Sequence, residues 1–216
     1  MSSEATQSVI APVASPEVIT FLQNRRSVLT KTLDTDPLER EAIETILNCG
    51  LRVPDHGALA PWKVVVIEKA AGSWFGTEVL APTFMANHSD ATEAMLDAER
   101  TRFTRGGVVF AVISTPVDSL KIRDFEMQLS AGAVCLNLVS AGLALGYGAQ
   151  WLTEWPAFDD TVLDALGGRV GTDKIAGFVY VGKKTIEPKP RRRPDPATTV
   201  HWLEPDIDAE TDQEAY

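Results

Sequence analysis

Arg52-Val53-Pro54-Asp55-His56-Gly57-Ala58-Leu59-Ala60-Pro61-Trp62 leads directly into the apolar run Lys63-Val64-Val65-Val66-Ile67. The β-branched residues of that run predict a buried strand. Apolar residues that recur at helical spacing between positions 42 and 51 predict a helix before it. The connection between helix and strand carries a cation, an imidazole and a carboxylate. Polar groups in loops on a rigid scaffold commonly contact ligands, so this connection is a candidate site.

Similar patterns extend on both sides of this stretch. Further strands are predicted at 108–113, 146–151 and 175–182, and helices at 16–24, from Asp36, at 125–145 and at 159–166, with a broken helical region at 70–105. Asp36 can cap a helix whose first position is Pro37. Strands separated by helices indicate an α/β or α+β domain with a covered sheet.

Length and charge limit the function classes. At 216 residues the chain fits one domain, expected over 16–203 between a flexible N-terminus at 1–15 and a flexible acidic tail at 204–216. The net charge of −10 argues against nucleic-acid binding. The sequence contains no apolar run of about 20 residues, so no membrane span is predicted. The N-terminus lacks a basic signal-peptide region, so we expect a cytoplasmic protein.

The two cysteines are expected to be structural. Cys49 and Cys135 both lie in apolar helical patterns, which predicts two buried thiols. Neither has another cysteine or a histidine at metal-ligand spacing, so no metal site is expected.

Two basic clusters could hold a phosphate. Arg25-Arg26-Ser27 offers two guanidinium groups and a hydroxyl where a helix ends, although a solvated helix end would look the same. Arg191 and Arg193 alternate in an extended segment, so both side chains point the same way. They could close over a phosphate or form a basic surface strip.

His56 and Trp62 each allow more than one interpretation. His56 could contact a ligand, donate a proton, or form a local hydrogen bond with Asp55. A hydrolase triad of Ser27, His56 and Asp55 is disfavoured because adjacent Asp and His residues rarely adopt the required orientation. Trp62 could pack in the core or border a flat ligand.

Taken in order, these segments resemble the FMN-dependent nitroreductase family, in particular its short NAD(P)H nitroreductase branch. The resemblance covers roughly residues 18–196. It rests on Arg25-Arg26-Ser27, the helix from Asp36, Arg52-Val53-Pro54-Asp55-His56-Gly57 with Pro61-Trp62, Ser130-Ala131-Gly132, Gly146-Tyr147-Gly148-Ala149-Gln150-Trp151, Gly177-Phe178-Val179-Tyr180-Val181-Gly182 and Arg191-x-Arg193-Pro194-Asp195.

The resemblance implies a three-layer α+β fold with a mixed central sheet flanked by helices, and a homodimer with FMN at the subunit interface. NADH or NADPH would be the reductant, and a nitroaromatic, a quinone or a related small molecule the acceptor, in a ping-pong two-electron reaction. His56 is the candidate proton donor, and no other side chain is given a catalytic role. The residues implied to bind the cofactor are Arg25, Arg26, Ser27, Arg52, His56, Trp151, Leu152, Thr153, Arg191 and Arg193.

Two alternatives remain open at this point. The same fold could carry other flavin chemistry, such as dehalogenation, enone reduction or flavin destruction. It could also bind a flavin without turnover.

Overall fold

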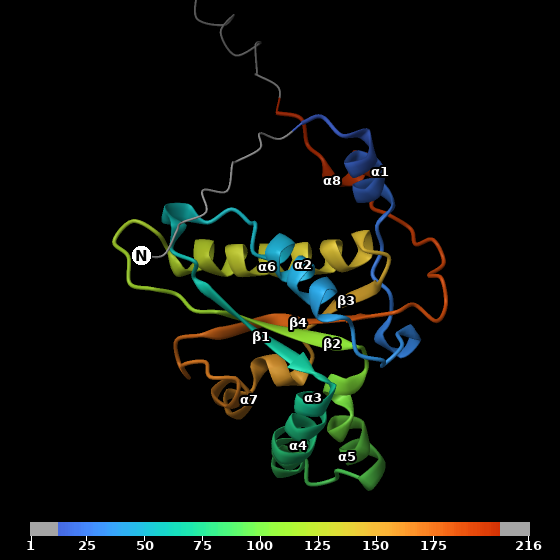
Figure 1. Ribbon diagram of the computed structural model, residues 1–216. Helices are drawn as coiled ribbons and strands as arrows, with labels where there is room; N and C mark the ends of the chain where they lie inside the picture. Colours follow the sequence, from blue (N-terminus) through green and yellow to red (C-terminus); the bar gives the residue numbers. More distant parts are fainter. Residues whose placement is uncertain (1–12, 204–216) are drawn as a thin grey trace, which may run out of the picture.

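The computed structural model describes residues 13–203, which form three layers (Figure 1). The acidic tail at 204–216 and most of the N-terminal segment at 1–15 lie outside the described residues. Ser15 is described, and its hydroxyl accepts a hydrogen bond from the Val18 N–H at the start of α1 (Pro16–Asn24). The proline at the first helical position of α1 needs no hydrogen-bond partner for a backbone N–H.

The middle layer is a four-stranded sheet in the order β1-β2-β4-β3. The strands are β1 (Trp62–Glu68), β2 (Val108–Ser114), β3 (Gly148–Leu152) and β4 (Lys174–Gly182). Every neighbouring pair is antiparallel, so the expected mixed sheet is wrong. The helix that connects β2 to β3 makes these two strands run in the same direction, but β4 inserts between them and pairs with both.

One face of the sheet is covered by α6 (Asp124–Ala144) and α2 (Arg40–Gly50) (Figure 1). Ile43 and Ile46 of α2 and Val134 and Leu138 of α6 are fully buried there. Among residues 13–203, α6 is the one helix that is long and apolar enough to cross a membrane. Half of its most apolar stretch is buried inside the protein. It packs on the sheet and on α2, and the core helix of a folded domain can have this length and apolar composition.

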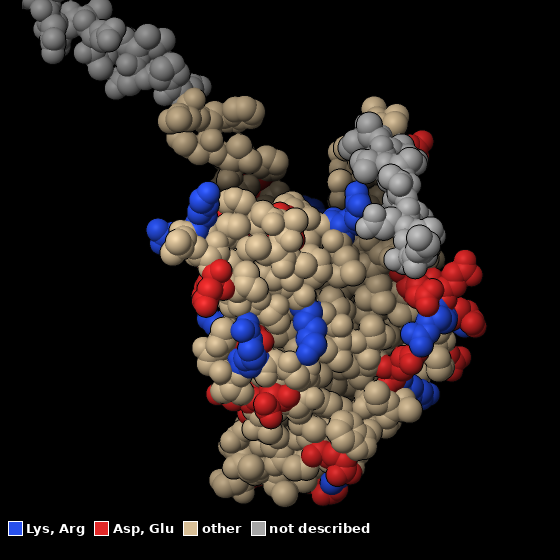
Figure 2. Space-filling view, turned by 60° about the vertical axis from the view of Figure 1, so that its left-hand side comes forward, with Lys and Arg blue, Asp and Glu red and all other residues tan. Residues whose placement is uncertain are grey.

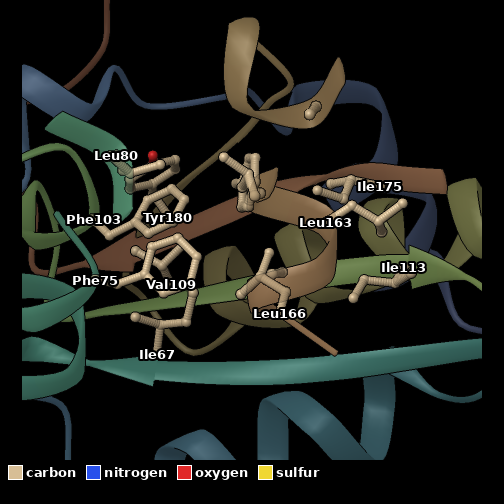
Figure 3. Packing of buried hydrophobic residues seen from close by; sticks show 14 of the residues in the cluster. Ile67, Phe75, Leu80, Phe103, Val109, Ile113, Leu163, Leu166, Ile175 and Tyr180 are labelled. Atoms are coloured by element: carbon tan, nitrogen blue, oxygen red, sulfur yellow. The ribbon is translucent and has the colours of Figure 1, made fainter. Parts of the chain in front are cut away.

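The opposite face is covered by a helical lobe and by α7 (Asp160–Ala165) (Figure 1). The lobe contains α3 (Lys69–Phe75), the π-helical turn η3 (Gly76–Leu80), α4 (Ala81–Asn87), α5 (Glu93–Arg100) and the 3-10 turn η4 (Arg102–Thr104). Figure 3 shows Phe103 of the lobe beside Tyr180 of β4, with ring centroids 6.4 Å apart. The predicted broken helical region at 70–105 is this lobe.

Two local predictions were wrong. The helix expected from Asp36 begins at Arg40, because the Asp36 N–H bonds the Asp34 side chain and Leu38 is buried in the core. The second error concerns the cysteines. Cys135 is buried, and this burial raises its pKa to about 12, but Cys49 lies on the exposed side of α2.

Candidate functional site

The Arg25-Arg26-Ser27 segment follows α1 directly and leads into residues that lie along the outer edge of β3. The Val28 N–H donates a hydrogen bond to the Ala149 carbonyl at 2.9 Å. The Thr30 N–H donates to Oε1 of Gln150 at 2.8 Å. Because β3 is at one end of the strand order, the Val28 bond engages a backbone edge that would otherwise be open, and both bonds tie the segment after the two arginines to β3.

The basic segment 183–193 lies against the segment that follows α1. Leu33 forms an isolated antiparallel bridge with Lys184. Further along, Nη2 of Arg193 donates a hydrogen bond to the Arg25 carbonyl at 2.8 Å. The two basic clusters of the sequence, far apart in the chain, are therefore in direct contact. The short helix α8 (Pro196–Thr199) follows, so the extended arm expected after β4 ends in one helical turn.

Together these segments line an open cavity of about 880 Å³, here called the arginine cavity. This volume is within the range of small-molecule sites. The cavity is lined by Arg25, Arg26, Ser27, Leu29, Gln150, Trp151, Arg191, Arg192, Arg193, Pro194, Asp195 and Thr198. Six of the ten residues implied by the resemblance are thus brought together.

The charge of the arginine cavity is strongly positive. Asp195 is its one acidic lining residue, and Oδ1 of Asp195 already accepts the Ala197 N–H at 3.0 Å. Nε of Arg25 and Nη1 of Arg26 are buried and have no hydrogen-bond partner among residues 13–203. Buried guanidinium donors without a partner are costly. The guanidinium groups that line the cavity could hold a phosphate monoester through charge-assisted hydrogen bonds.

Trp151 forms an aromatic wall of this cavity and is held by β4. Its Nε1 donates to the Ala176 carbonyl at 3.1 Å. A Cβ at Gly177 would lie 2.0 Å from that nitrogen, so the indole occupies the space that a side chain would need. The glycine in the middle of β4 therefore sets the position of Trp151.

The other four implied residues do not line the arginine cavity. Leu152 is half-buried against the core on the lobe side, and Thr153 is exposed beyond the end of β3. Arg52 is exposed after α2. His56 lies in η2 (His56–Ala58) and lines a separate hollow of about 10 Å³, which is space for about one water molecule.

The loop that carries His56 is held in a strained conformation. Oδ1 and Oδ2 of Asp55 accept the N–H groups of Leu59 at 3.1 Å and Ala60 at 2.7 Å. Ala58 and Ala60 have positive φ angles of 53° and 45°. Non-glycine residues persist in this region only when surrounding contacts hold them, and such strain clusters at functional sites. The Asp55 carboxylate is thus used within the loop and is not bonded to His56.

A relay of hydrogen bonds ties the same loop to α6. Nε1 of Trp62 donates to Oγ of Ser130 at 3.0 Å, and this hydroxyl donates to the Pro54 carbonyl at 2.7 Å. Trp62 also packs against the α2/α6 core, so its role in the structure is packing. Ser27 lies in the arginine cavity and His56 in the other hollow, so the two are not joined in a triad.

His56 is paired with Glu126 of α6. Its Nδ1 lies 3.0 Å from Oε2 of Glu126, and both side chains are partly exposed. The hydrogen bond with His56 and a second one from the Arg123 N–H lower the pKa of Glu126. An ionised Glu126 can accept a proton from Nδ1, and Nε2 makes no hydrogen bond within residues 13–203.

Sequence reasoning missed several members of these sites. Arg192, Leu29 and Gln150 line the arginine cavity. The triple arginine at 191–193 was a signal for Arg192, and Gln150 lies in the Gly146–Trp151 stretch that carries the resemblance, but neither was assigned to the site. Glu126 was also missed, because nothing in the sequence connects it to a histidine 70 positions away.

Comparisons with known proteins agree on one family. A model of the Nitroreductase family matches residues 22–183. The protein "Putative NAD(P)H nitroreductase YdjA" of Escherichia coli (strain K12) is 31% identical over 192 residues, which cover 87% of this chain and 100% of that protein.

Solved structures show the same fold. A nitroreductase-like family protein from Bacillus cereus superimposes with a TM-score of 0.72 at 18% identity, covering 90% of this chain and 100% of that one. A nitroreductase with bound FMN from Bacteroides fragilis NCTC 9343 has a TM-score of 0.64 at 18% identity, with 88% and 100% covered.

Proposed function

Because this chain belongs to the nitroreductase family, we propose that it is an FMN-dependent oxidoreductase. It uses NADH or NADPH to reduce a nitroaromatic, a quinone or a related acceptor in a ping-pong two-electron reaction. The observation that carries this proposal is the convergence of five arginines and Ser27 on the arginine cavity, within residues 13–203. When bound, FMN supplies the redox chemistry, and the protein supplies binding and orientation.

The arginine cavity would hold the phosphate end of the cofactor. Arg25, Arg26 and Ser27 supply donors from one side, and Arg191 or Arg193 supplies them from the other. These groups line one cavity, and forked guanidinium donors match phosphate oxygens. From there β3 leads away from the arginines, so the backbone of Trp151, Leu152 and Thr153 would lie along the ring.

A second copy of the chain would complete the site. None of the nine residues of α1 is buried, although Val18, Ile19 and Leu22 are apolar. A helix this short is marginal in water without packing.

The exposed side of α6 has the same character as α1. Phe125, Leu129 and Leu136 are exposed there, and spacings of four and seven residues place them on one face. Broad uncharged areas also lie between scattered charged side chains in Figure 2. Such surfaces are typical of interfaces, which supports a homodimer.

A dimer would account for the separation of Arg52 and His56 from the arginine cavity. Both are exposed and do not line that cavity. The loop that carries His56 is nevertheless held rigidly, with its imidazole oriented by Glu126. We therefore assign Arg52 and His56 to the flavin of the opposite subunit, with His56 as the candidate proton donor.

Steady-state kinetics test the proposed function. Under anaerobic conditions, FMN-loaded protein should turn over NADH or NADPH repeatedly only when an acceptor is present, and double-reciprocal plots at several acceptor concentrations should be parallel. Intersecting plots would contradict the ping-pong order. If the protein binds FMN but turns over neither nucleotide with nitroaromatic or quinone acceptors, it would be a flavin-binding module without activity. Turnover of a halogenated or enone substrate alone would point to other flavin chemistry.

A further inference from the structure

A buried ion pair lies just beyond the end of β3, between the helical lobe and the sheet. The side chains of Glu99 and Arg102 are only 6% and 9% exposed. Two bonds join them, from Nε to Oε2 at 2.6 Å and from Nη2 to Oε1 at 2.5 Å. Nε1 of Trp155 also donates to Oε2 of Glu99 at 3.1 Å. A buried charge pair contributes little net stability by itself, so a further bond from Arg102 to a residue outside the pair suggests another role for it.

This further bond joins Arg102 to Glu154: Nη1 of Arg102 donates to Oε2 of Glu154. Burial alone would lower the pKa of Arg102. The hydrogen bonds with Glu99 and the charges of Glu154 and Glu99 outweigh this effect and raise it. The guanidinium therefore stays charged and is shared between a buried carboxylate and a partly exposed one.

The backbone of Glu154 is strained. Its φ is 53° and its ψ is −175°, a region that is essentially restricted to glycine. No backbone hydrogen bond within residues 13–203 involves its N–H, although its carbonyl accepts the Ala157 N–H at 3.3 Å. The bond with Arg102 is the polar side-chain contact that holds this residue in place.

We propose that Arg102 is a positioning residue for the flavin site: by holding Glu154, it fixes the backbone of Leu152, Thr153 and Glu154 in the conformation that faces the ring. This proposal rests on the proposed function, in which β3 and the residues after it lie along the flavin. The Arg102–Glu154 contact thereby joins the helical lobe to the segment that follows β3. Arg102 does not contact the reacting atoms.

The backbone conformation gives a test that separates positioning from chemistry. Glu154→Ala removes the carboxylate and keeps a Cβ, so the strained conformation loses its support. Glu154→Gly removes the carboxylate as well, but glycine adopts this conformation without strain. Both variants leave the buried Arg102–Glu99 pair intact, so both should fold, which circular dichroism checks.

The first measurement is FMN affinity with the bound-flavin visible spectrum. Glu154→Ala should weaken FMN binding by about tenfold, because binding must then restore the strained backbone. It should also shift the spectrum toward that of free FMN. Glu154→Gly should recover most of the affinity and the bound spectrum. Glu93→Ala is the matched control, since it removes an exposed contact with Arg100 in the same lobe and should change neither.

The second measurement does not depend on FMN. Amide hydrogen exchange at residues 152–155 of the flavin-free protein should accelerate in Glu154→Ala and much less in Glu154→Gly. Equal FMN affinities or equal exchange in the two variants would overturn the proposal. If wild-type protein does not bind FMN, the proposed function fails and the flavin role of Arg102 fails with it. Unchanged exchange in Glu154→Ala would overturn the positioning role alone.

Discussion

Nδ1 of His56 lies 3.0 Å from Oε2 of Glu126, and this contact orients an imidazole that no other side chain of the described chain holds. Oε1 of Glu126 accepts the Arg123 N–H at the start of α6. The carboxylate is therefore fixed by the helix before it contacts the histidine. His56 is thus an exposed histidine on a strained loop with one ring nitrogen paired to a carboxylate, which agrees with its proposed role at the flavin of a second subunit.

Removing the histidine should change the titration of the carboxylate. The pKa of Glu126 is lowered mainly by its hydrogen bond with His56. In His56→Ala it should rise toward the ordinary value but stay slightly low, because the Arg123 N–H remains. NMR titration of the side-chain carboxyl carbon measures this. His88→Ala is the control, since Nδ1 of His88 contacts the Phe84 carbonyl instead.

The same shift gives a sign for the pH dependence of stability. A pKa that is lower in the folded than in the unfolded state stabilises the fold above the unfolded pKa, and this contribution is lost as the pH falls through the folded pKa. Wild-type protein should therefore lose more stability on acidification than His56→Ala. Identical Glu126 midpoints in the two proteins would contradict the assigned hydrogen bond.

Arg26→Ala should weaken FMN binding by roughly 1.5–3 kcal/mol, because it removes a charged donor from the proposed phosphate site. Isothermal titration calorimetry measures the change. Arg40→Ala, which removes an exposed arginine at the start of α2, should have no effect. An unchanged affinity in Arg26→Ala, or equal losses in both variants, would remove Arg26 from the phosphate site.

Gly177→Ala should displace Trp151, because the new Cβ would lie 2.0 Å from Nε1 of the indole. The expected destabilisation is about 1–3 kcal/mol, as for other overpacked sites, with weaker FMN binding. Gly146→Ala is the control: its φ is also positive, at 88°, but a Cβ there meets nothing within 4 Å. Denaturant unfolding and FMN titration compare the two. Equal effects would show that backbone strain matters and the indole does not.

Leu129→Asp should break the proposed homodimer, because it places a charge on the exposed apolar face of α6. Light scattering coupled to size-exclusion chromatography should show a dimer for wild-type protein and a monomer with lost FMN for the variant. Phe158→Asp is the control, since Phe158 is 79% exposed in η5 (Trp155–Phe158), which packs with the lobe-side core. A wild-type monomer that retains FMN would refute the shared site.

The sequence predicted elements whose signal is local. Val108–Ile113 is recognisable as a buried strand from its β-branched run, and β2 spans it. Arg25, Arg26, Arg191 and Arg193 were singled out by contiguity and alternation, and all four line one cavity.

The errors and omissions have long-range causes. The antiparallel pairing of β2 and β3 with β4 follows from the insertion of β4 between them, and strand order depends on contacts between segments that are distant in the chain. The pairs His56–Glu126 and Arg102–Glu154 join distant segments, so spacing could not reveal them. The start of α2 at Arg40 depends on the burial of Leu38, a tertiary contact that outweighs the capping preference of Asp36.

The most direct test of the account is an anaerobic titration of FMN-loaded protein, followed by visible absorbance. Addition of NADH or NADPH should bleach the flavin band, and subsequent addition of a nitroaromatic or a quinone should restore it. This pair of half-reactions is what a ping-pong oxidoreductase must perform. A bound flavin that neither nucleotide bleaches would contradict the account.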